Sequence, residues 1–264
     1  MIVALVDNGS LEPAAHLHLR AAAAALGQRC GTTVHAVSWK HSDRIAASAL
    51  GDTPAWTLPT FIRRMVALGQ REYVFVPFFI SAQGAVGSAL RLELEQLQQE
   101  EIAFDFTLTP GLSSADTLGA ILADNIGHTR AARDLRAPAV IIVDHGGPSA
   151  TSAHLRDQVT ERVRSLLGDS VSRVTAASME GQHPPLLATQ LRARGCAGEE
   201  VIVASLFLSP GRHAGPGGDL DQICAASPAR CHRTALAGSH PLILDTLASA
   251  LERTLPNLAS TLPA

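Results

Sequence analysis

Three loops in the second half of the chain carry side chains that could bind a metal ion and accept protons. His145 directly follows an apolar run, Glu180 follows a second run, and His213 lies in a glycine-rich loop after a third. Two neutral imidazoles can hold a divalent first-row metal ion and leave coordination positions open. A carboxylate beside them could bind the metal or accept protons. These residue types predict a metal site made of His145, Glu180 and His213.

Other residues of the same loops are candidates for supporting roles. His183, three residues after Glu180, is either a further ligand or a polar residue in the turn before two prolines. Gly146 and Gly147 follow His145, and because glycine allows tight turns we expect them to leave room for a bulky ligand. The loop around His213 contains no Gly-Lys-Ser/Thr sequence, and the first strand has no GxGxxG, so we expect no nucleotide.

An internal repeat shows which elements must position these residues. In each half an apolar run leads into Val-Asp-X-Gly and a helical pattern, and three further apolar segments follow. Strands that alternate with helical patterns indicate βα units and parallel sheets. We therefore predict an α/β fold with two similar lobes, each a mostly parallel sheet flanked by helices, and a cleft between them. The paired segments are 2–26 with 140–163, 32–43 with 172–185, 72–85 with 200–215, and 104–112 with 231–251.

The repeat places the lobe boundary near residue 130, so that residues 1–130 form one lobe and residues 131–264 the other. Residues 126–140 would connect them. In open α/β sheets ligands bind beyond the carboxyl ends of the strands, which is where the three loops of the second lobe lie. The first lobe has different residues at the aligned positions: Asn8 for His145, Lys40 for Glu180, and Ala85 for His213. It has therefore lost the predicted metal-site groups.

Composition excludes several classes of protein. Hydrophobic residues make up 46% of the 264 residues, aromatic residues only 4%, and the formal charge is −3. With no excess of basic residues, we expect no nucleic-acid partner and no polybasic membrane patch. No apolar run has the ~18 residues of a membrane span and none resembles a signal peptide, so we expect a cytoplasmic protein. The four cysteines have no CxxC spacing, although Cys224 and Cys231, near His232, could be a metal site.

Three ordered motifs, VIIVDHGG, ASMEGQHPPL and VIVASLFLSPGRHAGPGGDL, resemble those of the CbiX/SirB class II chelatases. Members of that family insert cobalt or ferrous iron into sirohydrochlorin, and the long members are duplications of one module. The resemblance implies that His145 and His213 present the metal and that Glu180 is the acidic site residue. It also implies a later acidic residue, for which Asp219 is the best match and Asp221 competes.

The resemblance implies an ATP-independent metal chelatase (a lyase) of cobalamin or siroheme biosynthesis. Its metal substrate would be Co²⁺ or Fe²⁺, although the same donors suit Ni²⁺ and Zn²⁺, and its partner would be a tetrapyrrole. Lys40 and Arg212 are expected to bind the substrate because sirohydrochlorin carries many carboxylates, and Gly146 and Gly147 are expected to leave room for the macrocycle. Two lobes in one chain predict a monomer or a weak homodimer.

The long members of the family usually keep the working site in the N-terminal half, and here the arrangement is inverted. Two other functions fit the same residues. One is a metal or tetrapyrrole carrier without turnover, and the other is a metal-assisted hydrolase that activates water.

Overall fold

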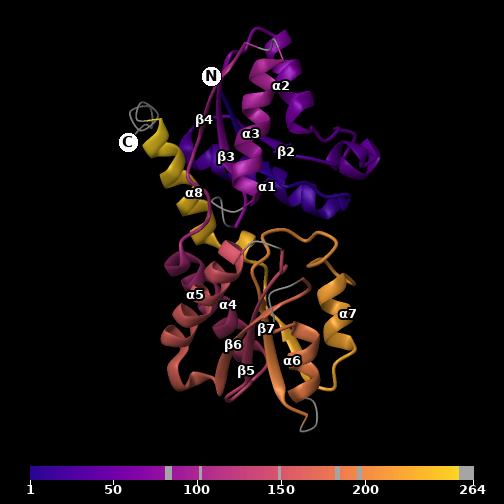
Figure 1. The fold of residues 1–264 in the computed structure, drawn as a ribbon, viewed down its shortest axis with the longest axis vertical. Helices are drawn as coiled ribbons and strands as arrows, with labels where there is room; N and C mark the ends of the chain where they lie inside the picture. Colours follow the sequence, from indigo (N-terminus) through magenta and orange to yellow (C-terminus); the bar gives the residue numbers. More distant parts are fainter. Residues whose placement is uncertain (81–84, 101–102, 148–149, 182–184, 195–197, 256–264) are drawn as a thin grey trace. The chain divides into compact units, whose positions relative to one another are not determined.

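The computed structural model describes residues 1–264 except 81–84, 101–102, 148–149, 182–184, 195–197 and 256–264. Contacts within the chain divide it into two compact units. Unit 1 consists of Met1–Leu112 together with Pro241–Ala264, and unit 2 consists of Ser113–His240. Each unit is built on its own four-stranded sheet (Figure 1).

The sheet of unit 1 is parallel throughout, with strand order β2-β1-β3-β4. Phe75 of β3 lies in a core with Phe61, Leu90 and Leu94 from the helices that pack on one face of the sheet. On the other side α1 packs against β1 and β2. The elements of unit 1 are β1 (Ile2–Asp7), α1 (Pro13–Cys30), β2 (Val34–Ser38), η1 (Ser42–Arg44), η2 (Ala47–Leu50), α2 (Leu58–Ala67), β3 (Glu72–Pro77), α3 (Ala85–Gln99), β4 (Asp105–Leu108) and α8 (Pro241–Thr254).

Unit 2 repeats this topology with strand order β6-β5-β7-β8, again all parallel. Every residue of the central strand β5 is buried, as its continuous apolar run predicts for a parallel strand covered on both faces. Ile141 and Val143 pack with Leu187 of α6 and Leu220 of α7. The elements are α4 (Ala115–Ala132), β5 (Ala139–Asp144), α5 (Ala150–Leu167), η3 (Gly168–Ser170), β6 (Arg173–Ser178), α6 (Leu187–Arg194), β7 (Glu200–Ser205), α7 (Asp219–Ala225), β8 (Arg230–Arg233) and η5 (Ala237–Ser239).

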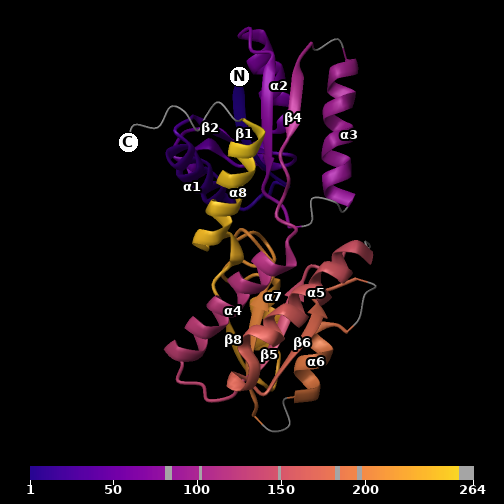
Figure 2. The same ribbon diagram turned by 90° about the vertical axis from the view of Figure 1, so that its left-hand side faces the viewer.

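Two helices, α4 and α8, each belong to one half of the sequence repeat but pack in the unit formed by the other half. Helix α4 follows the first sheet in sequence but packs against α5 and β7 of unit 2, and α8 follows the second sheet but packs against α1 of unit 1. Figures 1 and 2 show α4 beside α5 and the yellow α8 among the elements of unit 1. The units therefore differ from the expected lobes 1–130 and 131–264. Residues 126–132, expected as connector, form the last turns of α4.

The two sheets repeat the same backbone contacts where their strands end. Asp7 is paired in register with Ser38, and Asp144 with Ser178. Beyond the strands, the Lys40 amide donates to the Asn8 carbonyl at 3.3 Å. The predicted fold class is confirmed: two parallel α/β sheets flanked by helices. No helix in the described part of the chain is both long and apolar enough to cross a membrane.

Candidate metal centre

The three predicted site residues follow three neighbouring strands of unit 2. His145 comes directly after β5, Glu180 is two residues beyond β6, and His213 lies in the loop that joins β7 to α7. The strand after β5 in sequence, β6, lies on one side of it, and the next strand, β7, lies on the other side, so the strand order reverses at β5. Such a reversal of strand order opens a crevice at the carboxyl ends of the strands, where ligands of open α/β sheets bind.

The side chains of these three residues meet at this edge of the sheet. Nε2 of His145 lies 3.2 Å from Nε2 of His213, and their rings are nearly perpendicular, at 78°. Oε1 of Glu180 lies 3.3 Å from the same nitrogen of His145. The side chains of His145 and Glu180 are about half exposed, at 47% and 60%, so the group opens to solvent. The structure thus brings together residues that are 33 to 68 positions apart in sequence.

The separation of the two imidazole nitrogens suits a shared metal ion. A metal–nitrogen bond of ~2.1 Å places two adjacent donors ~3.0 Å apart at a 90° angle and ~3.4 Å apart at a tetrahedral angle. The 3.2 Å between the His145 and His213 nitrogens lies between these values. An ion bound there would replace the hydrogen bond that the two nitrogens can form at this distance.

Asp219 determines which nitrogen of His213 is free for a ligand. Its Oδ2 lies 2.6 Å from Nδ1 of His213. A carboxylate only accepts hydrogen bonds, so Nδ1 carries the proton and Nε2 keeps its lone pair toward His145. Asp221, the other acidic candidate, instead pairs with Arg233 and accepts from the Gly217 amide at 2.7 Å. The pKa of Asp221 is lowered by the hydrogen bond from Arg233.

Backbone packing in the glycine-rich loop holds His213 in place. The Leu220 amide donates to the His213 carbonyl at 3.0 Å. A Cβ on Gly218 would lie 2.4 Å from the Arg212 carbonyl oxygen, so a side chain there would force the loop apart. The Arg212 side chain is 79% exposed, and its Nε lies 3.9 Å from Oδ2 of Asp219. Glycine in this loop therefore permits the tight turn that presents the imidazole.

The two glycines after His145 have different structural roles. Gly146 has φ +87°, and a Cβ on it would lie 1.8 Å from the carbonyl oxygen of Glu180. The backbone of the next loop, rather than a ligand, therefore occupies the space beside Gly146. A Cβ on Gly147 would meet nothing within 4 Å, so of the two glycines Gly147 is the one beside which the described residues leave open space.

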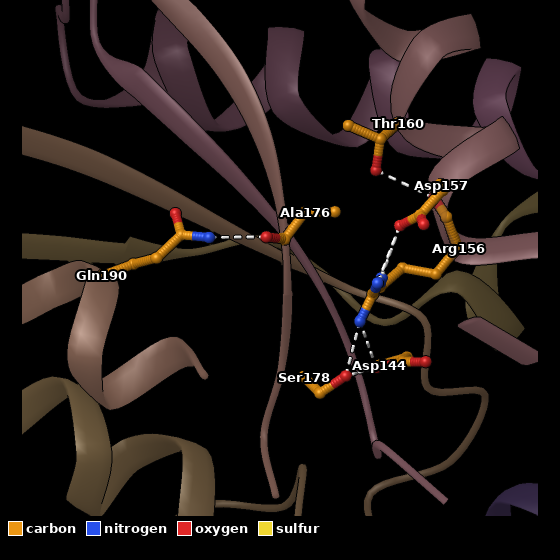
Figure 3. Close-up of polar contacts among 7 residues, drawn as sticks. All are labelled: Asp144, Arg156, Asp157, Thr160, Ala176, Ser178 and Gln190. Atoms are coloured by element: carbon orange, nitrogen blue, oxygen red, sulfur yellow. Dashed lines mark hydrogen bonds and ion pairs between the residues drawn. The ribbon is translucent and has the colours of Figure 1, made fainter. Parts of the chain in front are cut away.

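A polar cluster of Asp144, Ser178 and Arg156 is buried at the ends of β5 and β6 (Figure 3). The Ser178 hydroxyl donates to Oδ1 of Asp144 at 2.8 Å and accepts from Nη1 of Arg156 at 2.5 Å. The Arg156 guanidinium reaches down from α5, is 3% exposed, and also binds Asp157. Burial raises the pKa of Asp144 against the lowering effects of Ser178 and Arg156. The cluster joins the ends of β5 and β6, one residue before His145 and two before Glu180.

This cluster was not predicted from the sequence, although one of its members recurs in the internal repeat. The Asp of Val-Asp-X-Gly recurs in both halves as Asp7 and Asp144. A carboxylate at the end of an otherwise apolar strand needs hydrogen-bond partners when buried, which is the signal that could have indicated them. Arg156 carries no such signal, because a helical arginine is usually solvent-exposed.

Lys40 and His183 were also predicted to belong to the site. Lys40 belongs to unit 1, where its Nζ lies 3.9 Å from the centre of the Trp39 ring. His183 lies outside the described residues, and the side chain of Ala85 is likewise not described. In the described part of the chain no group of three or more His, Cys, Asp or Glu side chains is arranged to hold a metal ion together. The candidate centre is thus two imidazoles with one carboxylate beside them.

Solved chelatase structures share this fold. SirB from Bacillus subtilis with Fe³⁺ matches with a TM-score of 0.67 at 12% identity, covering 99% of this chain and 98% of SirB. CbiX, the terminal enzyme of siroheme biosynthesis in denitrifying bacteria, matches with a TM-score of 0.69 at 17% identity, covering 97% and 100%. SirB of Bacillus subtilis subspecies spizizenii in complex with cobalt gives 0.62 at 13% identity, covering 99% and 98%. The sequence matches no protein-family model and no curated protein. The chain therefore has the fold of the sirohydrochlorin chelatases.

Proposed function

We propose that this protein inserts a divalent metal ion, Co²⁺ or Fe²⁺, into sirohydrochlorin or a related tetrapyrrole. The observation that carries the proposal is the 3.2 Å separation of the His145 and His213 Nε2 atoms at the strand-order reversal of unit 2. The fold supports it, because solved structures with this fold include a chelatase with bound cobalt and one with bound Fe³⁺.

Two imidazoles can hold the metal substrate without retaining it. Asp219 directs the lone pair of His213 Nε2 outward, and His145 presents its own Nε2 beside it. Two protein donors leave the other coordination positions to water or to incoming pyrrole nitrogens. As those nitrogens bind the ion, they replace the imidazoles one at a time, and the metal passes into the macrocycle.

The exchange releases two pyrrole protons, and the site contains bases for them. Glu180 Oε1 lies 3.3 Å from Nε2 of His145, so one carboxylate stands where the ring nitrogens would meet the metal. An imidazole that has lost the metal is itself a base near neutral pH. One proton passing to Glu180 and one to a released histidine would balance the reaction, after which solvent removes both.

Carboxylates of the tetrapyrrole require cationic partners. Arg212 is the exposed cation next to the site, only one residue from His213. A Cβ on Gly147 would meet nothing within 4 Å, and this open position beside His145 favours the approach of a flat macrocycle. Lys40 of unit 1 is the further candidate for a substrate carboxylate, and exchanging Lys40 for Glu should weaken tetrapyrrole binding.

Visible absorption spectroscopy tests the proposal. Sirohydrochlorin with Co²⁺ or Fe²⁺ and the protein should show the bands of the metal-loaded ring growing faster than without protein. His145→Ala and His213→Ala should each reduce this rate at least tenfold, since each removes one of two ligands. His128→Ala is the matched control, because that histidine lies on α4, is 78% exposed and pairs with Asp124 away from the candidate metal centre. Full activity in either site variant would refute the assigned site. Tetrapyrrole binding without a metal-dependent change in the bands would indicate a carrier instead.

A further inference from the structure

Two free thiols of unit 2 face each other outside the candidate metal centre. Cys224 lies in the last turn of α7 and Cys231 in β8, and both are partly exposed. Both side chains pack against the same apolar core, α7 contacts β8, and a hydrogen bond joins the two thiols. The function proposed above uses neither of them.

The surrounding contacts fix helix α7 against strand β8 in this register. Asp221 lies one helical turn before Cys224, on the same side of α7, and it binds Arg233. Arg233 and Cys231 are two residues apart in β8 and so point to the same face of the strand. An ion pair and a thiol pair therefore join the two elements side by side.

The neighbouring histidine does not complete a metal site with these thiols. His232 lies between Cys231 and Arg233, so its side chain points to the opposite face of β8. There its Nε2 lies 2.5 Å from Oε2 of Glu200. His232 is therefore not available as a third ligand, and the metal site that the sequence allowed at Cys224, Cys231 and His232 is reduced to a pair of thiols.

We propose that Cys224 and Cys231 form a reversible disulfide with each other. The oxidant is a low-molecular-weight disulfide such as glutathione disulfide. The Cys231 thiolate attacks one sulfur of the oxidant, which breaks its S–S bond and releases a thiolate. That thiolate takes the proton of Cys224. The Cys224 sulfur then attacks the mixed disulfide at Cys231 and displaces the second glutathione as a thiolate, which takes up from solvent the proton that Cys231 released when it ionised. One oxidant disulfide is reduced to two thiols, and the protein dithiol is oxidised to one disulfide.

The two thiols differ in reactivity in the way that these reaction steps require. The hydrogen bond from Cys224 is the main reason that the pKa of Cys231 falls to about 7, and Ser227 contributes in the same direction. The same hydrogen bond and burial raise the pKa of Cys224. Since the thiolate is the nucleophile, Cys231 attacks first and Cys224 resolves the mixed disulfide. The bond would hold α7, and with it Asp219 at its first residue, against β8.

Peptide mapping by mass spectrometry after treatment of the full chain with glutathione disulfide tests the proposal. The native protein should yield a Cys224–Cys231 linked peptide that dithiothreitol reverses. Cys224→Ser should instead accumulate glutathione on Cys231, because serine cannot resolve the mixed disulfide. The matched variant Cys231→Ser should react more slowly, because burial still raises the pKa of the remaining Cys224 thiol.

Alkylation gives a second readout that does not depend on the oxidant. Without the hydrogen bond from Cys224, the pKa of Cys231 should move from about 7 toward the ~8.5 of an ordinary thiol. The smaller thiolate fraction is partly offset by greater nucleophilicity, so alkylation of Cys231 at pH 7 should slow about threefold in Cys224→Ser. Glutathione that stays on Cys231 of the native protein, or two thiols that stay free in excess oxidant, would overturn the proposal. An unchanged alkylation profile in Cys224→Ser would overturn the assigned order of attack.

Discussion

Single backbone positions determine how the loops of the candidate metal centre fit together. Gly146 lies against the Glu180 carbonyl, and the Glu180 amide donates to the His145 carbonyl at 3.2 Å. The position of the Glu180 carboxylate therefore depends on the absence of a side chain at residue 146. Gly147, one residue later, has no such constraint.

Alanine substitution should separate these two neighbouring glycines. Gly146→Ala places a Cβ 1.8 Å from the Glu180 carbonyl oxygen in a backbone conformation at φ +87°. The left-handed conformation alone costs about 1–2 kcal/mol, and displacement of the Glu180 loop adds to it. Gly147→Ala, which meets nothing within 4 Å, should stay within about 0.5 kcal/mol of the native protein. Urea unfolding measures both, and equal losses of stability would contradict the assignment.

Asp219 is expected to act through His213. Asp219→Asn removes the carboxylate that holds the proton on Nδ1, and such changes beside a metal-binding histidine typically cost 10- to 100-fold in metal affinity. Asp221→Asn is the control, because Asp221 binds Arg233 and the Gly217 amide instead of the histidine. Calorimetric titration with Co²⁺ should show the loss for Asp219→Asn and less than about a threefold change for Asp221→Asn. A larger loss of Co²⁺ affinity in Asp221→Asn than in Asp219→Asn would instead assign the supporting role to Asp221.

At corresponding strand ends, each sheet buries an Asp and a Ser side chain, and the third polar side chain beside them differs between the two units. In unit 2 the buried Asp144 and Ser178 have the guanidinium of Arg156 beside them. In unit 1 the buried Asp7 lies next to Ser38, whose Oγ is 3.3 Å from Nδ1 of His16. The position next to the buried Asp–Ser pair is thus taken by Arg156 in unit 2, which is always charged, and by His16 in unit 1, which can lose its charge.

The two titratable groups of unit 1 should offset each other as the pH changes. Burial raises the pKa of Asp7 from 3.8 to about 6, so its contribution to stability is greatest below pH 3.8 and is lost as the pH rises through 6. Burial, and to a lesser degree Arg20, lowers the pKa of His16 from 6.5 to about 4. Its contribution is therefore complete above pH 6.5 and is lost as the pH falls toward 4. Between pH 4 and 6 the two slopes oppose each other.

Neutral substitutions should expose each slope separately. Asp7→Asn should make unit 1 less stable as the pH falls from 6.5 to 4, and His16→Gln should make it less stable as the pH rises from 4 to 6. Each slope is at most about 1.4 kcal/mol per pH unit. Tryptophan fluorescence during urea unfolding reports unit 1, because Trp39 and Trp56 both lie there. Parallel pH profiles for the two variants would contradict this account.

Sequence patterns predicted the sheets better than the helices that cover them. The apolar runs and the recurring Val-Asp-X-Gly placed His145 at the end of β5, because a buried parallel strand has a recognisable composition and end. The convergence of His145, Glu180 and His213 followed from the common edge of parallel strands. The partner Arg156 and the close packing of Gly146 on Glu180 could not be predicted, because both depend on contacts between segments distant in sequence.

The exchange of α4 and α8 ties each unit to the other half of the sequence. An amphipathic helix shows which of its faces is buried but not which sheet it covers. Leu122 of α4 and Leu251 of α8 are both fully buried, the first in unit 2 and the second in unit 1. The chain therefore passes between the units twice, at Leu112–Ser113 and at His240–Pro241.

Matched leucine substitutions in the two exchanged helices test this division. Leu251→Ala should lower amide protection in β1 although residue 251 is near the end of the chain, and should leave β5 protected. Leu122→Ala should lower protection in β5 and leave β1 unchanged, although residue 122 comes before the second sheet. Each buried leucine truncation costs about 2–5 kcal/mol, which corresponds to a loss of protection of more than tenfold. Native-state hydrogen exchange read by mass spectrometry resolves the two strands in one experiment. Loss of protection in β1 from Leu122→Ala, with β5 unchanged, would assign the helices to the halves of the repeat instead.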